Sequence, residues 1–129
     1  MVYQKSCASG GDRFMKDSAL YLIHVRECLE KINSYLPENK KDFLETSMVQ
    51  DAILRNLEIM GESIKKLPQE WKDTQPQIEW IKIGNFRNVL AHEYLGVDLD
   101  TVWLIIEDYL PELKKAVTQM CDQLLNGEV

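Results

Sequence analysis

The residues of this chain that could do chemistry gather in one short stretch, at Arg87, Asn88, His92 and Tyr94. Arg87 carries a permanent, forked cation that is suited to binding a phosphate. His92, one of only two histidines in the chain, can accept or release a proton near neutral pH. Tyr94 adds a hydroxyl group two residues further on. Together these side chains could bind a phosphodiester and move protons around it.

Cleavage of RNA without a metal needs a base for the ribose 2′-OH, an acid for the leaving 5′ oxygen and a cation beside the phosphorus. His92 can be the base or the acid but not both in one step, and Arg87 can bind the phosphate through two hydrogen bonds. One chain therefore lacks a second proton-transfer group. A two-fold dimer would bring a second His92 and a second Arg87 to the same cleft, so we expect a homodimer with a composite active site. No metal or cofactor is expected, and the expected product carries a 2′,3′-cyclic phosphate.

Each of these residues also has a purely structural interpretation. Arg87 could form a salt bridge with an acid of the same bundle, and His92 could lie at a helix end, where a cation suits the helix dipole. Asn88, four residues before His92, could orient the imidazole or contact phosphate, or it could be a surface amide. Tyr94 could be a half-buried aromatic at the end of a helix. The residue types alone leave these alternatives open.

The elements that must position this stretch are predicted to be helices. Apolar residues spaced by three and four predict a first helix over about residues 17–36 and a second that starts near Ser47. Ser47 and Gln50 have the spacing of a capping box, after a loop through residues 40–42, and Pro68 ends the second helix. A third helix, over about residues 76–93, is expected to carry the reactive stretch.

The fourth helix is predicted over about residues 98–125, where apolar positions alternate steps of four and three. Pro111 is expected to kink or split it. The predicted fold is therefore all-α, an antiparallel up-down four-helix bundle with helix four kinked at Pro111. Residues 1–14 are expected to be a flexible extension. Residues 15–129 are expected to form a single helical domain.

Two features near the expected third helix have alternative interpretations. Gly84, one turn before Arg87, removes a side chain, which could leave room for a phosphate or a partner helix, or could serve close packing. Arg55 and Glu58, three residues apart, could line a cleft or form a solvated ion pair of little value. The sequence does not decide between them.

Composition is that of an ordinary globular domain. The 129 residues are 45% hydrophobic and 28% charged, which is enough for a core. No apolar run approaches membrane length and no signal-peptide core is present, so we expect a cytoplasmic protein without membrane contact. Three widely spaced cysteines fit reduced thiols better than a disulfide framework or a zinc site.

The net charge of −6 is unfavourable for a protein that binds nucleic acid, because such proteins usually carry a basic surface. Any contact with RNA must therefore be local. The candidate basic residues for such a contact are Arg55, Lys65, Lys66, Lys82 and Arg87.

The reactive stretch resembles the signature of a known family. Arg87, His92 and Tyr94 form an Arg-x4-His-x-Tyr pattern, with a polar residue directly after the arginine. This pattern is similar to that of the HepT-like ribonuclease toxins of the HEPN superfamily. Further resemblances lie at residues 53–62, Leu67, Pro68, Trp80 and residues 98–103. The resemblance runs from about residue 15 to about residue 125.

The resemblance implies a metal-independent endoribonuclease toxin of a type II toxin–antitoxin system, with Arg87 and His92 catalytic in a homodimer. It also implies a minimal nucleotidyltransferase as the antitoxin partner, which attaches adenylate groups to Tyr94. An added phosphodiester would bring charge and bulk to the site and would occupy Arg87.

A second hypothesis is a non-catalytic helical interaction module that only binds a nucleotidyltransferase partner, and the acidic charge favours it. A carboxylate-bridged metal bundle is disfavoured, because such sites use Glu-x-x-His pairs on two helices. His24 follows no such glutamate, and Glu93 lies directly beside His92.

Overall fold

The computed structural model describes residues 10–86 and 98–125, and every regular element in those two ranges is helical. The longer helices are α1 (Gly10–Tyr35), α3 (Ser47–Lys65), α7 (Leu99–Asp108) and α8 (Leu110–Met120). The shorter elements are α2 (Lys40–Glu45), α4 (Gln69–Lys72), α5 (Trp80–Gly84) and a π-helical turn at Cys121–Leu125. The prediction of an all-α protein is confirmed.

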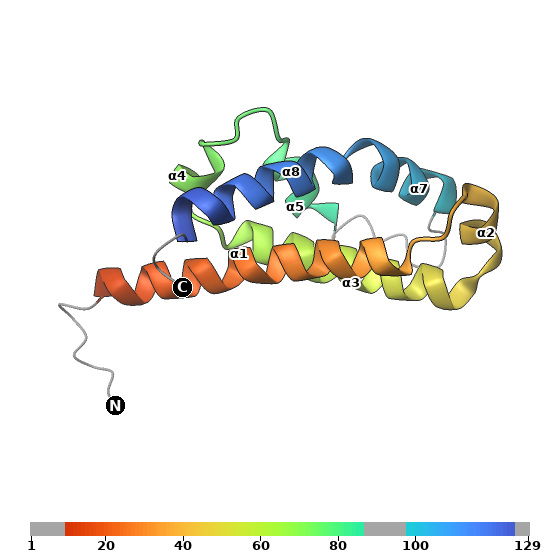
Figure 1. The fold of residues 1–129 in the computed structure, drawn as a ribbon, viewed down its shortest axis with the longest axis horizontal. Coiled ribbons are helices and arrows are strands. Elements are labelled where there is room, and N and C mark those ends of the chain that lie inside the picture. Colours follow the sequence, from red (N-terminus) through yellow and green to blue (C-terminus); the bar gives the residue numbers. More distant parts are fainter. Residues whose placement is uncertain (1–9, 87–97, 126–129) are drawn as a thin grey trace.

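The two longest helices, α1 and α3, lie side by side and antiparallel (Figure 1). Helix α2 connects them along the chain and packs against α3 and α7 at one end of the molecule. Helices α7 and α8 follow one another along the opposite side and return toward the end where α1 begins (Figure 1). Helix α5 packs against α3, and α8 packs against α1. The up-down four-helix arrangement stays a prediction, because residues 87–97 lie outside the described part of the chain.

The core is built from the apolar stripes that the sequence predicts. Burial of one large aliphatic side chain contributes about 1.5–3 kcal/mol, so such stripes supply most of the driving force for packing. The buried stripe residues of α1 and α3 are Leu22, Val25, Leu29, Ile32, Ile53, Leu57, Met60 and Ile64. Those of α7 and α8 are Trp103, Ile106, Leu110, Leu113, Val117 and Met120.

Helix α2 corrects the prediction of a loop through residues 40–42. Asn39 caps this helix, since its side-chain oxygen accepts a hydrogen bond from the backbone N–H of Asp42 at 2.9 Å. Phe43 is fully buried, and its ring centre lies 5.4 Å from that of Trp103 on α7. A short helix forms here because one cap and one buried ring stabilise it. The segment has no periodic apolar stripe, so its sequence pattern does not predict a helix.

The predicted capping box at Ser47 is wrong. Ser47 is the first residue of α3, and Thr46 occupies the N-cap position without a side-chain cap hydrogen bond. The Gln50 side chain donates instead to the backbone carbonyl of Phe43 at 2.9 Å. Gln50 therefore satisfies a backbone carbonyl near the end of α2. The spacing of Ser47 and Gln50 does not predict this contact, because it depends on how α2 packs beside α3.

The predicted third helix begins later than expected. Helix α5 starts at Trp80, rather than near residue 76, and ends at Gly84 with Asn85 as its C-cap. Turns precede it, with backbone hydrogen bonds from Gln75 to Lys72 and from Ile78 to Gln75. The connection predicted between the second and third helices also contains a short helix, α4, in which the side chain of Trp71 is buried.

The predicted fourth helix is divided at Tyr109, between α7 and α8, with Pro111 in the first turn of α8. Proline has no N–H to donate to the carbonyl four residues earlier, so an uninterrupted helix is disfavoured at this point. A kink angle at Pro111 stays a prediction. At the other end, α1 begins at Gly10 rather than residue 17, and residues 1–9 lie outside the described part.

Two cysteines lie in the described part, Cys28 and Cys121, and both are buried free thiols. Burial raises the pKa of each thiol above its ordinary value, which keeps it protonated near neutral pH. Cys7 lies outside the described residues. No helix in residues 10–86 or 98–125 combines the length and the apolar character needed to cross a bilayer.

The contact between Phe43 and Trp103 predicts a large effect of truncation. Phe43→Ala should lower the free energy of unfolding by about 3–5 kcal/mol, because it removes a fully buried ring. Urea denaturation of the purified protein measures this change. Met48→Ala is the control, since Met48 is 82% exposed and should change stability little. Equal stabilities of the two variants would contradict the packing described for α2.

Candidate functional site

The four residues that the sequence singles out, Arg87, Asn88, His92 and Tyr94, all lie within residues 87–97, outside the described part of the chain. Their roles stay predictions. The structure describes the two segments that hold this stretch at its ends. Helix α5 and Phe86 precede it, and Asp98 with α7 follows it.

The preceding segment is anchored by three buried side chains, those of Trp80, Ile83 and Phe86. The indole N–H of Trp80 lies 3.0 Å from the carbonyl oxygen of Lys72 and 3.1 Å from that of Gln75, and donates to both. Ile83 and Phe86 thus face the core. The backbone that leads directly into Arg87 is therefore fixed by packing on one side and by hydrogen bonds on the other.

Helices α3 and α5 approach so closely that a Cβ atom at Gly61 of α3 would press against the backbone of α5. A Cβ atom on Gly61 would lie 3.3 Å from the carbonyl oxygen of Gly84 and 3.4 Å from that of Ile83. A Cβ atom on Gly84 would lie 3.3 Å from Cγ of Lys65. These contacts support close helix packing as the role of Gly84, because α3 already occupies the space beside it.

Tyr109, between α7 and α8, connects two residues of the preceding segment. Its hydroxyl oxygen accepts a hydrogen bond from Nζ of Lys82 at 2.7 Å, and its ring lies edge-on to Phe86 with 6.3 Å between ring centres. The ammonium is closer to the hydroxyl than to the ring centre, at 5.1 Å, so this contact is a hydrogen bond rather than a cation over the ring face. The hydrogen bond raises the pKa of Lys82, with a smaller contribution from Glu79 at 3.6 Å.

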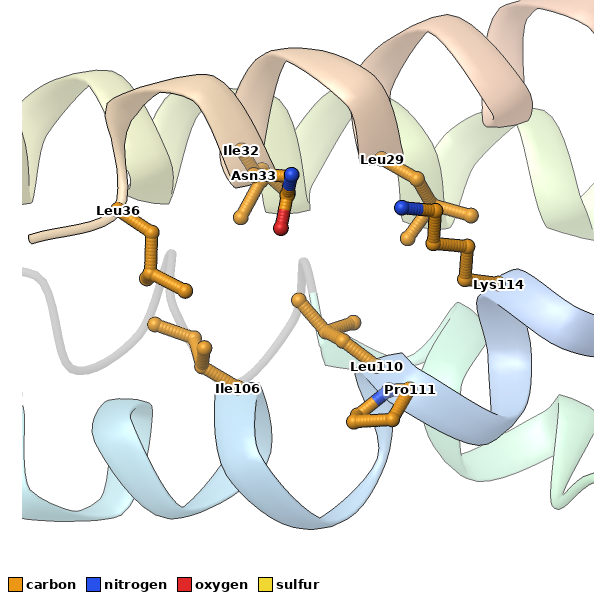
Figure 2. Close-up of a pocket in the computed structure, with 8 residues that line it drawn as sticks. All are labelled: Leu29, Ile32, Asn33, Leu36, Ile106, Leu110, Pro111 and Lys114. Carbon is orange, nitrogen blue, oxygen red and sulfur yellow. The ribbon is translucent and has the colours of Figure 1, made fainter. Parts of the chain in front are cut away.

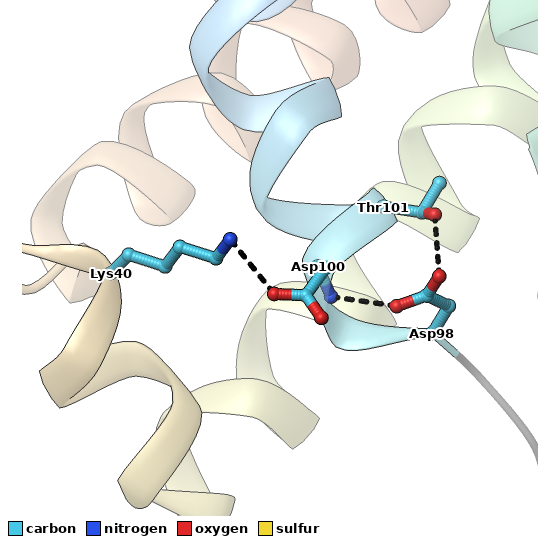
Figure 3. A network of polar contacts seen from close by, with 4 residues as sticks. All are labelled: Lys40, Asp98, Asp100 and Thr101. Atoms are coloured by element: carbon cyan, nitrogen blue, oxygen red, sulfur yellow. Dashed lines mark hydrogen bonds and ion pairs between the residues drawn. The ribbon is translucent and has the colours of Figure 1, made fainter.

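The following segment begins with a helix cap, which Figure 3 shows. One carboxylate oxygen of Asp98 accepts from the backbone N–H of Asp100, and the other accepts from the hydroxyl of Thr101, both at 3.0 Å. Such a cap stabilises a helix by about 0.5–2 kcal/mol. Asp100 also pairs with Lys40 of α2 at 2.8 Å, and this hydrogen bond raises the pKa of Lys40.

Most of the basic residues selected as candidate RNA contacts have neighbours of their own. Arg55 donates to Glu58 at 3.1 Å, and Lys65 lies 3.7 Å from an acid one turn away. The Lys66 ammonium lies 5.4 Å from the centre of the Tyr21 ring. The Arg55 side chain is 70% exposed, so its pair is worth only about 0–1 kcal/mol. Whether Arg55 and Glu58 line a cleft stays a prediction.

Figure 2 shows an apolar cavity of about 330 Å³ between α1 and the junction of α7 with α8. Among the described residues that line it, the polar side chains are those of Asn33 and Lys114. No histidine or carboxylate belongs to that lining, so no pair of proton-transfer groups meets there. The described residues also form no cluster of three or more His, Cys, Asp or Glu side chains that could hold a metal ion.

The fold and these anchors define a class of protein, an α-helical domain that holds a stretch with Arg-x4-His-x-Tyr spacing between two packed helices. The model of the family described as "Ribonuclease HepT-like" matches residues 25–120, a range that includes both anchors and the stretch between them. The chain belongs to this HepT-like ribonuclease family. The activity of the family is that of a ribonuclease.

Similar proteins include "Putative RNase TTE0752" of Caldanaerobacter subterraneus subsp. tengcongensis, 35% identical over 82% of this chain and 96% of that protein. "Probable ribonuclease HepT" of Thermococcus cleftensis is 36% identical over 73% of this chain and 86% of that protein. "Gamma-glutamylcyclotransferase and putative RNase MJ0434" of Methanocaldococcus jannaschii is 34% identical over 84% of this chain. The match spans only 50% of that last protein. No solved structure matches the chain significantly.

Two residues that hold the segment preceding Arg87 were missed by reasoning from the sequence, Gly61 and Tyr109. An isolated glycine inside a periodic helix is a signal of close approach, and Gly61 carries it. Tyr109 carries only a weak signal, an aromatic residue with a polar tip two positions before Pro111. Its partners on α5 are known only once the helices are packed.

The close approach of α3 and α5 predicts different effects for two alanine substitutions. Gly61→Ala should destabilise the protein by about 1–3 kcal/mol, because its new methyl group meets backbone carbonyls that cannot move independently. Gly84→Ala should be tolerated better, since its methyl group meets the flexible Lys65 side chain. Thermal unfolding monitored by circular dichroism ranks the two variants, and the reverse order would contradict the described packing.

Proposed function

We propose that this protein is a metal-independent endoribonuclease toxin of a type II toxin–antitoxin system, which acts in the cytoplasm as a homodimer. Residues 15–129 form its catalytic domain in this proposal. Arg87 and His92 are the catalytic residues, and Asn88 and Tyr94 support them. The observation that carries the proposal is the intact Arg-x4-His-x-Tyr set within a family match over residues 25–120.

The proposed reaction is an internal transfer at phosphorus. One His92 imidazole takes the proton of a ribose 2′-OH, and the 2′ oxygen forms a bond to the adjacent phosphorus. The bond from phosphorus to the 5′ oxygen breaks, and a second, protonated His92 supplies the proton to that oxygen. Arg87 stabilises the charge on the phosphoryl oxygens. The products are a 2′,3′-cyclic phosphate and a free 5′-hydroxyl.

The need for two imidazoles supports a dimer, and α5 has an exposed apolar residue that is suited to a dimer contact. Ile81 lies on this helix, in the segment that precedes Arg87, and it is 81% exposed. An apolar side chain with this exposure on the element that leads into the reactive stretch is suited to a two-fold contact. We propose that the two copies of α5 lie near this contact.

A minimal nucleotidyltransferase is the proposed antitoxin. It would transfer adenylate from a nucleoside triphosphate to the Tyr94 hydroxyl and release pyrophosphate. The added phosphodiester would place negative charge close to Arg87 and would compete with the RNA phosphate for it. This modification would inhibit cleavage without unfolding the protein.

The catalytic roles are tested with total RNA in the presence of a chelator. Wild-type protein should cleave, and His92→Ala should cut the rate by about 10²–10⁴-fold, because it removes a proton-transfer group. Arg87→Ala should also be impaired, and Arg87→Lys should recover only part of the rate, since lysine cannot form the two-point contact. Lys114→Gln, on α8, controls for a general loss of charge. Cleavage that is unchanged in both alanine variants would come from a contaminant and would refute the assignment.

The acidic net charge favours the second candidate, a non-catalytic module that only binds a nucleotidyltransferase. A wild-type protein that never cleaves RNA, but whose partner binding survives His92→Ala, would select this module over the nuclease. Growth arrest on expression that His92→Ala abolishes would exclude it.

The dimer contact is tested by Ile81→Asp, which would place a charge in an apolar interface. We expect the wild type to sediment as a dimer and Ile81→Asp as a folded monomer that no longer cleaves RNA. Met48→Asp is the matched control, because Met48 is equally exposed, at 82%, but lies at the start of α3. A dimeric Ile81→Asp variant, or a monomeric wild type with full activity, would contradict the proposed arrangement.

A further inference from the structure

The Lys82 side chain is a surface cation with a hydrogen-bond partner from another part of the chain. Its Nζ donates to the Tyr109 hydroxyl at 2.7 Å, although the side chain is 57% exposed. An ammonium has three N–H donors, and one of them is used here. Glu79 lies 3.6 Å away, which is an ion-pair distance rather than a hydrogen-bond distance. Donors therefore remain for an outside acceptor.

Tyr109 also relates this cation to the reactive stretch. Its ring packs edge-on against Phe86, the residue directly before Arg87. Lys82 and Phe86 thus contact the same side chain, one through the hydroxyl and the other through the ring. The position of the Lys82 ammonium is therefore coupled to the point where the chain enters residues 87–97.

The surface beside Lys82 is hollowed, and the exposed Ile81 side chain also lines the hollow. Lys72 and Lys82 both line an open depression of about 560 Å³ beside α4 and α5. No acid of the described residues lies within ion-pair distance of Lys72, and partial burial lowers its pKa. Of the two acids in the lining, Asp73 accepts a hydrogen bond from Gln69, and Glu79 is the neighbour of Lys82.

We propose that Lys82 contacts a phosphate of the RNA strand and that Tyr109 is the residue that positions it. This inference rests on the proposed nuclease function. The occupant is a single strand of RNA, one phosphate of which accepts a hydrogen bond from Lys82. Because the side chain is already ordered, less conformational entropy is lost on binding than for a free surface lysine.

The competing explanation is an ordinary surface ion pair between Lys82 and Glu79. Such a pair is worth little, and its loss would leave RNA binding unchanged. The two explanations make opposite predictions for Glu79→Gln. If Lys82 contacts phosphate, removal of the adjacent negative charge should tighten RNA binding. If the ion pair is all that Lys82 provides, the substitution should have no effect on RNA.

The experiment measures binding of a fluorescent, fully 2′-O-methylated oligonucleotide by anisotropy over a range of salt concentrations, because this ligand cannot be cleaved. Lys82→Gln should weaken binding several-fold and reduce the slope of log affinity against log salt by about 0.7, the contribution of one phosphate contact to a single strand. Tyr109→Phe keeps the ring that packs on Phe86 and should weaken binding less. Glu79→Gln should tighten binding, and Lys114→Gln should behave as wild type.

Cleavage kinetics with unmodified RNA provide the second measurement. Lys82→Gln should raise KM and leave kcat nearly unchanged, since the lost contact is made in the ground state and in the transition state alike. A wild-type salt slope in Lys82→Gln, with no effect of Glu79→Gln, would overturn the inference even if cleavage is intact. Binding that depends on Lys82 in a protein without cleavage would refute the nuclease but not the contact. A protein that binds no oligonucleotide would refute both.

Discussion

The close approach of α3 and α5 at Gly61 and Gly84 is the constraint on which the candidate site depends. The close contact of the two helix backbones limits how near to α3 any substitution at Gly61 would let α5 pack. The placement of α5 in turn buries Ile83 and Phe86 and brings Lys82 within reach of Tyr109. The entry to the reactive stretch is thus set by backbone packing in the core, which is more rigid than any contact made by surface side chains.

The acidic charge of the chain limits how it can bind RNA. A protein with a net charge of −6 gains little from diffuse attraction to phosphates, and several of its basic residues are already near acids. Under the proposed function, RNA binding would rely on a few local contacts, such as that of Lys82. This arrangement suits a nuclease that requires a correctly placed linkage more than one that binds any nucleic acid tightly. In the proposed mechanism, a single added negative charge, such as an adenylate on Tyr94, would inhibit cleavage.

In the proposed mechanism one chain lacks a second proton-transfer group, and the exposed surface of α5 is where a second copy would bind. A single imidazole cannot be both base and acid in one step, so the proposed reaction requires a second copy. The helix that leads into Arg87 leaves Ile81 uncovered, while its other face is sealed against α3 and the core. Assembly would then bury an apolar side chain and complete the active site in one event. Dimerisation and activity would be linked, so a dissociated toxin would be inactive.

Periodic apolar spacing and a motif are local properties, so the helical class, the core stripes of α1, α3, α7 and α8, the interruption near Pro111 and the family could be predicted from the sequence. The remaining features depend on packing between elements that are distant in the chain. Helix α2 forms because Phe43 packs on Trp103. The Gln50 side chain donates to the backbone carbonyl of Phe43 instead of capping α3. Helix α5 starts late because the indole N–H of Trp80 donates to carbonyls of the preceding segment. In each case a buried ring or a hydrogen bond joins residues from different elements. Packing determines which residues become partners, so a local sequence pattern does not predict the contact.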